Sequence, residues 1–216
     1  MDRELEKYLS EHSSPQNGAL EWIVRETNLR TNHAQMLSER SMGRFISMMS
    51  RIISPLNILE IGVFTGYSTV CLAEGLVRGG VIDAIEINDE LEELILQGYE
   101  KAGIKECVKL HIGDAKDIIA GLDRKYDLVY IDGNKREYPL YYDLIIDRLN
   151  DGGVIIADNV LWYGKVFNDD THQDAQTQGI LRFNEMVRND PRVENMILPL
   201  RDGVNIILKK NAGDCP

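Results

Sequence analysis

The sequence predicts an α/β fold, a doubly wound, seven-stranded, mostly parallel Rossmann-like sheet with an antiparallel C-terminal hairpin. After residue 54, apolar runs of strand length alternate with segments of helical periodicity. A glycine-containing turn follows the first of these runs, as in folds that bind nucleotide-like ligands. The last two runs are joined by a short segment ending in Asp202-Gly203, so they pair antiparallel, because a parallel pair needs a long crossover.

The first 54 residues read as helical. We expect helices over 2–11, 19–27 and 43–53, broken at Pro15 and by the polar stretch 31–38. We expect one domain over 1–216, with 1–54 as a helical cap and 55–210 as the core. Because these helices precede the first strand, they are expected to cap the site or to form an oligomer contact.

Seven strands are expected in the core. Their ranges are 57–61, 81–86, 108–112, 126–131, 154–157, 193–198 and 204–209. The expected helices between them are 67–77, 89–102, 115–120, 138–148 and 178–189, the last preceded by a polar loop at 163–177. Because the first five strands come with helical crossovers, they should run parallel, with helices on both faces.

Composition narrows the class of protein. The 216 residues suit one α/β domain, and the net charge of −11 gives no overall attraction for nucleic acid, although a local basic patch stays open. No apolar run approaches the roughly 20 residues of a membrane span, and the charged start does not resemble a signal peptide. Cys71, Cys107 and Cys215 are few, odd in number and widely spaced, which favours a reduced cytoplasmic location.

The glycine turn has the pattern Glu60-x-Gly62-x-x-x-Gly66. Glycine lets the backbone approach a ligand or a neighbouring element closely. The spacing differs from the dinucleotide pattern Gly-x-Gly-x-x-Gly, and no lysine is present to bind phosphate. The turn therefore indicates a cofactor with an amino-acid and sulfonium end, S-adenosylmethionine, with an ordinary strand-to-helix turn as the alternative.

Acidic side chains fall where several expected strands end, and these ends share one edge of the sheet. Glu86 lies where a carboxylate accepts the hydroxyls of a ribose, although it can instead begin a helix. Gly113-Asp114-Ala115 lies where an adenine would lie, with a simple turn as the alternative.

Asp132, Asp158 and Asn159 form a sharper set. Two carboxylates and an amide oxygen are hard ligands suited to Mg²⁺ or Ca²⁺, although Asp158-Asn159 can also simply turn the chain. Lys135 follows three residues after Asp132. It is a candidate general base if a metal and a cationic cofactor lower its pKa, and otherwise a surface lysine.

Five segments together resemble the cation-dependent O-methyltransferases, the caffeoyl-CoA and catechol O-methyltransferase group. The segments are 59–68, 131–135, 158–162, 189–194 and 198–204. The resemblance covers about residues 19–209. It implies methyl transfer from S-adenosyl-L-methionine to a hydroxyl of a small catechol-like phenolic acceptor, with a divalent cation (Mg²⁺ first, Ca²⁺ or Mn²⁺ as alternatives), and a homodimer.

The resemblance also implies roles residue by residue. Metal ligands are Asp132, Asp158 and Asn159, the general base is Lys135 beside Asp132, and the acceptor is lined by Trp162 and Tyr163. Cofactor contacts are implied at Leu37, Ser38, Glu60, Gly62, Val63, Ser68, Glu86, Ala115 and Asp132, and we expect Asp114, which precedes Ala115, to contact the cofactor as well. Asn134 stands where the plant enzymes have a second Asp, and Tyr163 where they have Asn, which puts the plant acceptor in question.

Three alternatives remain at this point. One is a relative that methylates hydroxylated uridine in tRNA, for which local basic residues would have to gather (Arg124, Lys125, Lys135, Arg136 and Lys165). The second is an NAD-dependent dehydrogenase, which the glycine spacing disfavours. The third is a non-catalytic binding module, against which the intact set of four polar site residues argues.

Overall fold

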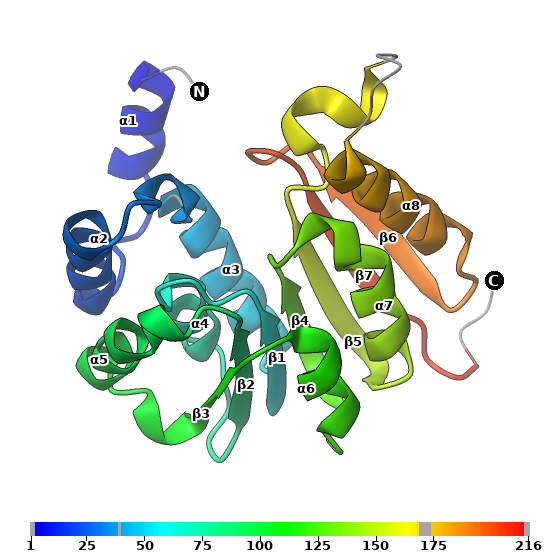
Figure 1. Cartoon of the computed structure of the whole chain (residues 1–216), viewed down its shortest axis with the longest axis horizontal. Helices are drawn as coiled ribbons and strands as arrows, with labels where there is room; N and C mark the ends of the chain where they lie inside the picture. Colours follow the sequence, from blue (N-terminus) through cyan, green and yellow to red (C-terminus); the bar gives the residue numbers. More distant parts are fainter. Residues whose placement is uncertain (1–2, 39, 169–173, 214–216) are drawn as a thin grey trace.

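The computed structural model describes residues 3–38, 40–168 and 174–213, and its central feature is a seven-stranded sheet (Figure 1). The strands are β1 (Asn57–Ile61), β2 (Val81–Glu86), β3 (Val108–Ile112), β4 (Tyr126–Ile131), β5 (Leu149–Asp158), β6 (Val193–Leu198) and β7 (Val204–Lys209). Their order is β3-β2-β1-β4-β5-β7-β6. The predicted fold class is confirmed.

Strand direction follows the connections. β1 to β5 pair in parallel, whereas β7 runs antiparallel to both β5 and β6. The strand order reverses between β1 and β4, since β2 and β3 are added on one side of β1 and β4 and β5 on its other side. In such sheets the ligand crevice lies beyond the carboxyl ends of the strands at this switch point.

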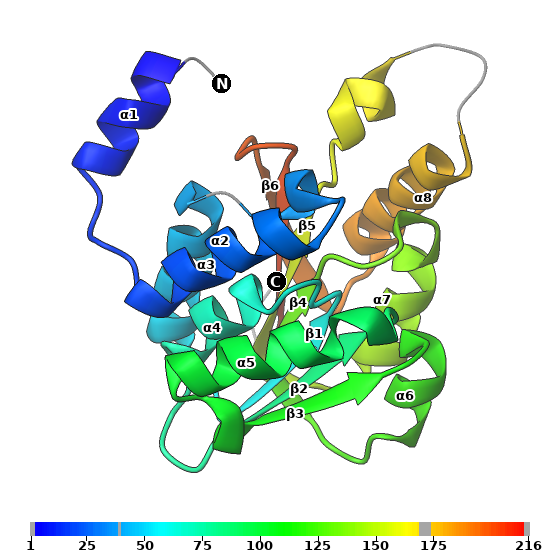
Figure 2. The same ribbon diagram turned by 60° about the vertical axis from the view of Figure 1, so that its left-hand side comes forward.

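Helices cover both faces of the sheet. They are α1 (Arg3–Glu11), α2 (Gly18–Arg30), α3 (Arg40–Ile53), α4 (Tyr67–Ala73), α5 (Glu92–Ala102), α6 (Ala115–Gly121), α7 (Tyr138–Ile146) and α8 (Ala175–Asn189). Buried side chains of α6, α7 and α8 form one apolar core with the sheet. Those of α2, α3, α4 and α5 form a second core on the other face. The helices α2 and α3 are therefore part of a structural layer, and Figure 2 shows α1 standing apart from it.

Several predicted helix ends are wrong, since α4 ends at Ala73 and not at 77, and α7 at Ile146 and not at 148. Two predicted starts are also wrong, each for a physical reason. β5 begins at Leu149, not at residue 154, because Leu149 pairs with Tyr126 before the register shifts and Val154 pairs with Leu128. α8 begins at Ala175, not at 178. Its first turn is polar and resembles a loop in sequence, but Asp174 caps it by accepting hydrogen bonds from the N–H groups of Gln176 and Thr177.

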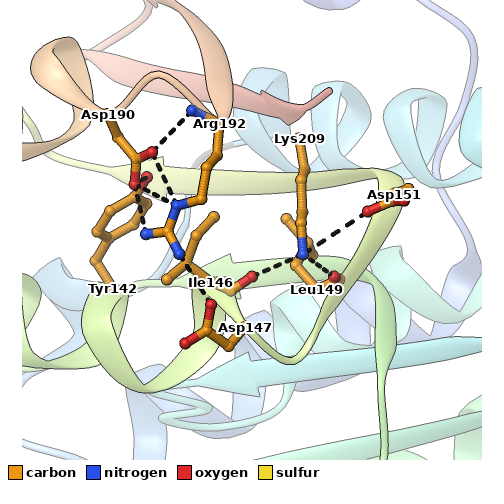
Figure 3. A network of polar contacts seen from close by, with 8 residues as sticks. All are labelled: Tyr142, Ile146, Asp147, Leu149, Asp151, Asp190, Arg192 and Lys209. Atoms are coloured by element: carbon orange, nitrogen blue, oxygen red, sulfur yellow. Dashed lines mark hydrogen bonds and ion pairs between the residues drawn. The ribbon is translucent and has the colours of Figure 1, made fainter. Parts of the chain in front are cut away.

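A polar network anchors the C-terminal hairpin at the amino-terminal edge of the parallel strands, away from the crevice (Figure 3). Arg192 donates to Asp190 and, at 2.8 Å, to Asp147, which follows α7. Lys209, at the end of β7, donates to the carbonyl of Leu149 at 2.7 Å. These contacts join β6 and β7 to the parallel part of the sheet.

Within the described residues, no helix has both the length and the apolar character needed to cross a membrane.

Candidate functional site

The glycine turn links β1 to α4 at the switch point. Gly62 has φ +92°, and its N–H donates to the carbonyl of Ile85 on β2 at 3.0 Å. A Cβ on Gly62 would lie 2.4 Å from the carbonyl oxygen of Asp132, so glycine is needed for close packing of two backbones. Gly66 has φ +86° and caps α4. The turn thus presses directly against the segment that follows β4.

Glu60 is the last but one residue of β1 and is completely buried. Its carboxylate accepts hydrogen bonds from the hydroxyls of Ser68 and Thr69, each at 2.5 Å. Burial raises the pKa of Glu60 to about 7, which the two hydroxyls only partly oppose, and the charge of Asp132 adds to the rise. Predicted cofactor residues Glu60 and Ser68 are therefore brought together by the structure.

Glu86 is the last residue of β2, and its carboxylate holds two backbone segments in place. Its carboxylate accepts from the N–H of Phe64 in the glycine turn at 2.7 Å and from that of Asn88 at 2.9 Å. Asp114 caps α6 by accepting from the N–H of Lys116 at 3.0 Å. Both carboxylates thus act as structural braces around the predicted cofactor position.

Asp132 and Lys135 follow β4 and contact each other. The Lys135 ammonium donates to Asp132 Oδ1 at 2.6 Å, and Lys135 is 7% exposed. Burial alone would lower the pKa of Lys135, but the adjacent Asp132 carboxylate outweighs burial and raises it. In the structure without ligands, Lys135 is a charged, inward-facing partner of Asp132 and not a surface lysine.

Asp158 is the last residue of β5, the neighbour of β4 in the sheet, and Asn159 follows it. Asp158 is 1% exposed, and it accepts from the Tyr130 hydroxyl at 3.2 Å and from the Asn159 N–H at 2.8 Å. Burial, followed by the charge of Asp132, raises the pKa of Asp158 to about 6. Asn159 has φ +60°, a left-handed conformation in which the chain turns sharply at the strand end.

Trp162 and Tyr163 lie in the broken 3₁₀ segment η5 (Trp162–Phe167), with ring centroids 5.3 Å apart. Trp162 packs against the core below α8, whereas Tyr163 is 79% exposed. The Tyr163 N–H donates to Asp202 Oδ1 at 2.6 Å, so the turn between β6 and β7 holds this loop. The predicted acceptor residues therefore stand beside the carboxyl end of β5.

Most of the remaining predicted cofactor residues lie in apolar surroundings. Val63 and Ala115 are buried, and Leu37 packs against the core that contains α3. Ser38 follows Leu37 and is partly exposed. The connection between α2 and α3 that carries Leu37 and Ser38 stands above the carboxyl edge of the sheet in Figure 2.

The chain is similar to known O-methyltransferases over most of its length. The family model described as O-methyltransferase matches residues 10–210. The chain belongs to the O-methyltransferase family. Caffeoyl-CoA O-methyltransferase of Medicago sativa is 33% identical over 197 residues, which cover 85% of this chain and 78% of the relative.

Solved structures of O-methyltransferases agree with the assignment. An O-methyltransferase from Bacillus cereus in complex with SAH has a TM-score of 0.88 at 28% identity, covering 96% of this chain and 97% of that one. TomG from Streptomyces achromogenes, involved in tomaymycin synthesis and crystallised with SAM, has a TM-score of 0.91 at 28% identity, covering 98% and 100%. The predicted family and enzyme class, an S-adenosylmethionine-dependent O-methyltransferase, are confirmed, and the dehydrogenase and binding-module alternatives are wrong.

The five basic residues considered for tRNA binding do not form one patch in this O-methyltransferase, although Lys165, which bonds Asp174 at 2.7 Å, lies at the same edge of the sheet as Lys135 and Arg136. Arg124 and Lys125 precede β4, whereas Lys135 and Arg136 follow it, so the two pairs lie at opposite edges of the sheet. Arg124 donates to the buried carboxylate of Asp83 at 3.2 Å, and Lys135 is itself buried. The tRNA alternative is therefore not favoured.

Several residues of the site were not predicted. Tyr130 and Tyr138 bind Asp158 through its side chain and its carbonyl, and Thr69 binds Glu60. Asn184 on α8 donates to the carbonyl of Val160 at 3.0 Å. Their partners are distant in sequence, so no local pattern marks them, although Asp202 falls in the Asp-Gly turn that the sequence does mark.

Proposed function

We propose that this O-methyltransferase transfers a methyl group to one hydroxyl of a catechol-like acceptor with the help of a divalent cation. The observation that supports it most is that Lys135 bonds Asp132 and that the charges of both act on Asp158, which ends the neighbouring strand β5 and precedes Asn159. The names of the relatives point the same way, since caffeoyl-CoA is a small molecule with adjacent hydroxyls.

The donor set fits a divalent cation. Burial, followed by the charge of Asp132, raises the pKa of the Asp158 carboxyl, and a bound cation would oppose both effects. Among the described residues, no group of three His, Cys, Asp or Glu side chains could hold a metal ion. The proposed set therefore has two carboxylates, and its third ligand is the amide oxygen of Asn159. A cation held there would act as a Lewis acid that lowers the pKa of an acceptor hydroxyl.

The chain's own residues supply the rest. S-adenosylmethionine, bound at the glycine turn beside Glu60 and Glu86, would provide the methyl group. The two glycines let the turn pack closely against Asp132 and Tyr99, and Trp162 and Tyr163 would orient the acceptor ring. In its charged form Lys135 would stabilise the anion that the hydroxyl becomes. To take the proton itself, Lys135 would first have to lose its own, which requires its bond to Asp132 to weaken. Alignment of the reactants would supply much of the acceleration.

The test is methylation of catechol acceptors with labelled donor, with and without a chelator. We expect Asp158→Ala and the isosteric Asp158→Asn to lower kcat at least about 100-fold while donor affinity changes little, because the donor contacts lie on other strands. Asp147→Ala removes an exposed carboxylate at the opposite edge and serves as the control. Unchanged turnover in the Asp158 variants would exclude the cation from the mechanism.

The predicted homodimer, the cytoplasmic location and the division into a cap and a core also remain proposals. Support for the location is limited to the cysteines, since both described ones, Cys71 and Cys107, are free.

A further inference from the structure

Hydrogen bonds link the carboxyl ends of four strands, β3, β2, β1 and β4, beside the proposed donor position. The Asp132 N–H donates to the carbonyl of Ile61 at 2.8 Å, which joins the ends of β4 and β1. The Glu86 carboxylate accepts from the Phe64 N–H at 2.7 Å, which joins β2 to the glycine turn. The Gly113 N–H donates to the carbonyl of Glu86 at 2.8 Å, which joins β3 to β2. Each of these links joins neighbouring strands and includes a backbone group.

A fourth link connects the outer two of these strands, β3 and β4, which are not neighbours in the sheet. Lys116 lies in the first turn of α6, after β3, and Glu137 lies in the short 3₁₀ helix η4 (Lys135–Glu137), after β4. The Lys116 ammonium donates to Glu137 Oε1 at 2.6 Å and lies 3.2 Å from Asp114 Oδ2. This ion pair closes the row of contacts into a ring, and it consists of side chains alone.

Glu137 is also bonded to the segment that carries Asp132. Its second oxygen, Oε2, accepts from the Tyr141 hydroxyl at 2.8 Å. A Cβ on Gly133, the residue after Asp132, would lie 3.2 Å from the Tyr141 ring, so the ring packs closely against the backbone there. Lys135 is only two residues before Glu137. Because these connections are short, the position of Glu137 affects the positions of both Asp132 and Lys135.

The place and exposure of the ion pair suit a role in shaping the site. The side chains of Lys116 and Glu137 are 33% and 25% exposed, and partly exposed ion pairs usually contribute little to the free energy of unfolding. The pair lies at the carboxyl edge of the strands, where the ligand crevice of such a sheet lies. Its loss should therefore affect the width of the crevice more than the stability of the fold.

We propose that Lys116 and Glu137 are positioning residues whose ion pair holds the segment after β3 against the segment that carries Asp132 and Lys135, and so keeps the donor site assembled. Neither residue has to touch the donor in this role. Without the pair the two segments would separate for part of the time, and the apparent affinity for the donor would fall by the fraction of molecules that remain assembled. The inference rests on the proposed donor position, but not on the acceptor or on a cation.

The experiment measures the Kd of S-adenosylhomocysteine by calorimetric titration, without acceptor or added cation, and the Tm of each ligand-free protein. We expect Lys116→Met and Glu137→Gln each to raise Kd about fivefold with little change in Tm. Asp114 accepts from the backbone N–H of Lys116, so Lys116→Met leaves the cap of α6 in place.

A double variant and a conservative variant separate the ion pair from other effects of the two substitutions. Lys116→Met combined with Glu137→Gln should raise Kd about fivefold and not about 25-fold, because the same interaction is lost in all three proteins. Lys116→Arg retains the charge and should keep Kd within about twofold of the wild-type value.

Arg51→Met is the matched control. It removes a cation that bonds Glu74 at 3.0 Å between α3 and α4, on the other face of the sheet, so Kd should stay at the wild-type value. An unchanged Kd in both single variants, or effects that multiply in the double variant, would overturn the inference.

Glu86→Gln tests the donor position separately. A raised Kd in this variant, with wild-type values for the Lys116 and Glu137 variants, would leave the donor position standing and reject the role of the ion pair. A wild-type Kd in Glu86→Gln would instead count against the donor position on which the inference rests.

Discussion

Glu60 is a carboxylate that the fold removes completely from water. It is fully buried, and its charge is opposed by burial and by the nearby carboxylates of Asp132 and Glu86. Two hydroxyl donors hold it without neutralising it. A buried carboxylate of this kind is suited to a site that later receives a cationic ligand, and in the ligand-free protein it makes stability depend on pH.

The direction of that dependence follows from the pKa, which is about 7 in the folded state and 4.5 in the unfolded reference. Between these values the folded protein binds more protons, so the free energy of unfolding falls as pH rises, by up to about 3 kcal/mol. Glu60→Gln does not titrate and should flatten this fall, leaving the smaller part due to Asp158. Urea unfolding of the wild-type protein and of this variant, both without ligand, at about pH 5 and about pH 8 measures the change in the free energy of unfolding with pH. An equal change in the two proteins would contradict the assignment.

At the residue scale, the sequence allows the chemistry-bearing side chains to be predicted but not how they are held. Asp132, Lys135 and Asp158 follow apolar strands, and the carboxyl ends of parallel strands share an edge, so their meeting is predictable. The left-handed backbone of Tyr163 and its fixation by Asp202 are not predictable, because they depend on a turn about 40 residues away. No local pattern encodes such a contact.

At the scale of elements, six of the seven strands have the predicted ends, because each is an apolar run bounded by Gly, Pro or polar residues. β5 is the exception, since its first residues pair through a register shift that lets Gly152 and Gly153 leave the regular ladder. The start of α8 was missed for a similar reason. A polar first turn is stabilised by one capping side chain, Asp174, and not by apolar periodicity.

The helix α8 supports the catalytic segments from behind. It packs against the short 3₁₀ helix η4 (Lys135–Glu137), and Gly179 is the point of closest approach. A Cβ there would lie 2.4 Å from the carbonyl oxygen of Lys135 and 2.7 Å from Cα of Arg136. Both are backbone atoms, so the clash is relieved only if α8 or η4 moves.

We therefore expect Gly179→Ala to destabilise the protein by about 1–3 kcal/mol and to lower kcat about tenfold or more, because displacement of η4 moves Lys135. Gly121→Ala is the control, since nothing lies within 4 Å of a Cβ there. Steady-state kinetics and thermal unfolding of the two variants test this. Loss of stability with unchanged kcat would show that α8 supports the fold without positioning Lys135.

At the scale of the whole molecule, the switch point joins the two apolar cores. The glycine turn leads into α4, which belongs to the core with α2, α3 and α5, whereas Asp132 and Lys135 lead into α7, which belongs to the other core. Contacts such as the close approach of Gly62 to the carbonyl of Asp132 cross between these halves. A ligand bound at the glycine turn would add further contacts across this boundary and stabilise the molecule as a unit.

We therefore expect S-adenosylhomocysteine, at about 100 times its Kd, to stabilise the protein by about 2.7 kcal/mol, which corresponds to a rise in Tm of roughly 5–10 °C. NADH at the same concentration should give a much smaller rise, because the turn lacks the dinucleotide spacing of glycines. Glu86→Gln should reduce the shift caused by S-adenosylhomocysteine, since it weakens both the brace on Phe64 and the expected ribose contact. An equal rise in Tm with both ligands would mean that the glycine spacing does not select the methyl donor, and selectivity would then have to come from Glu60 and the residues around Asp132.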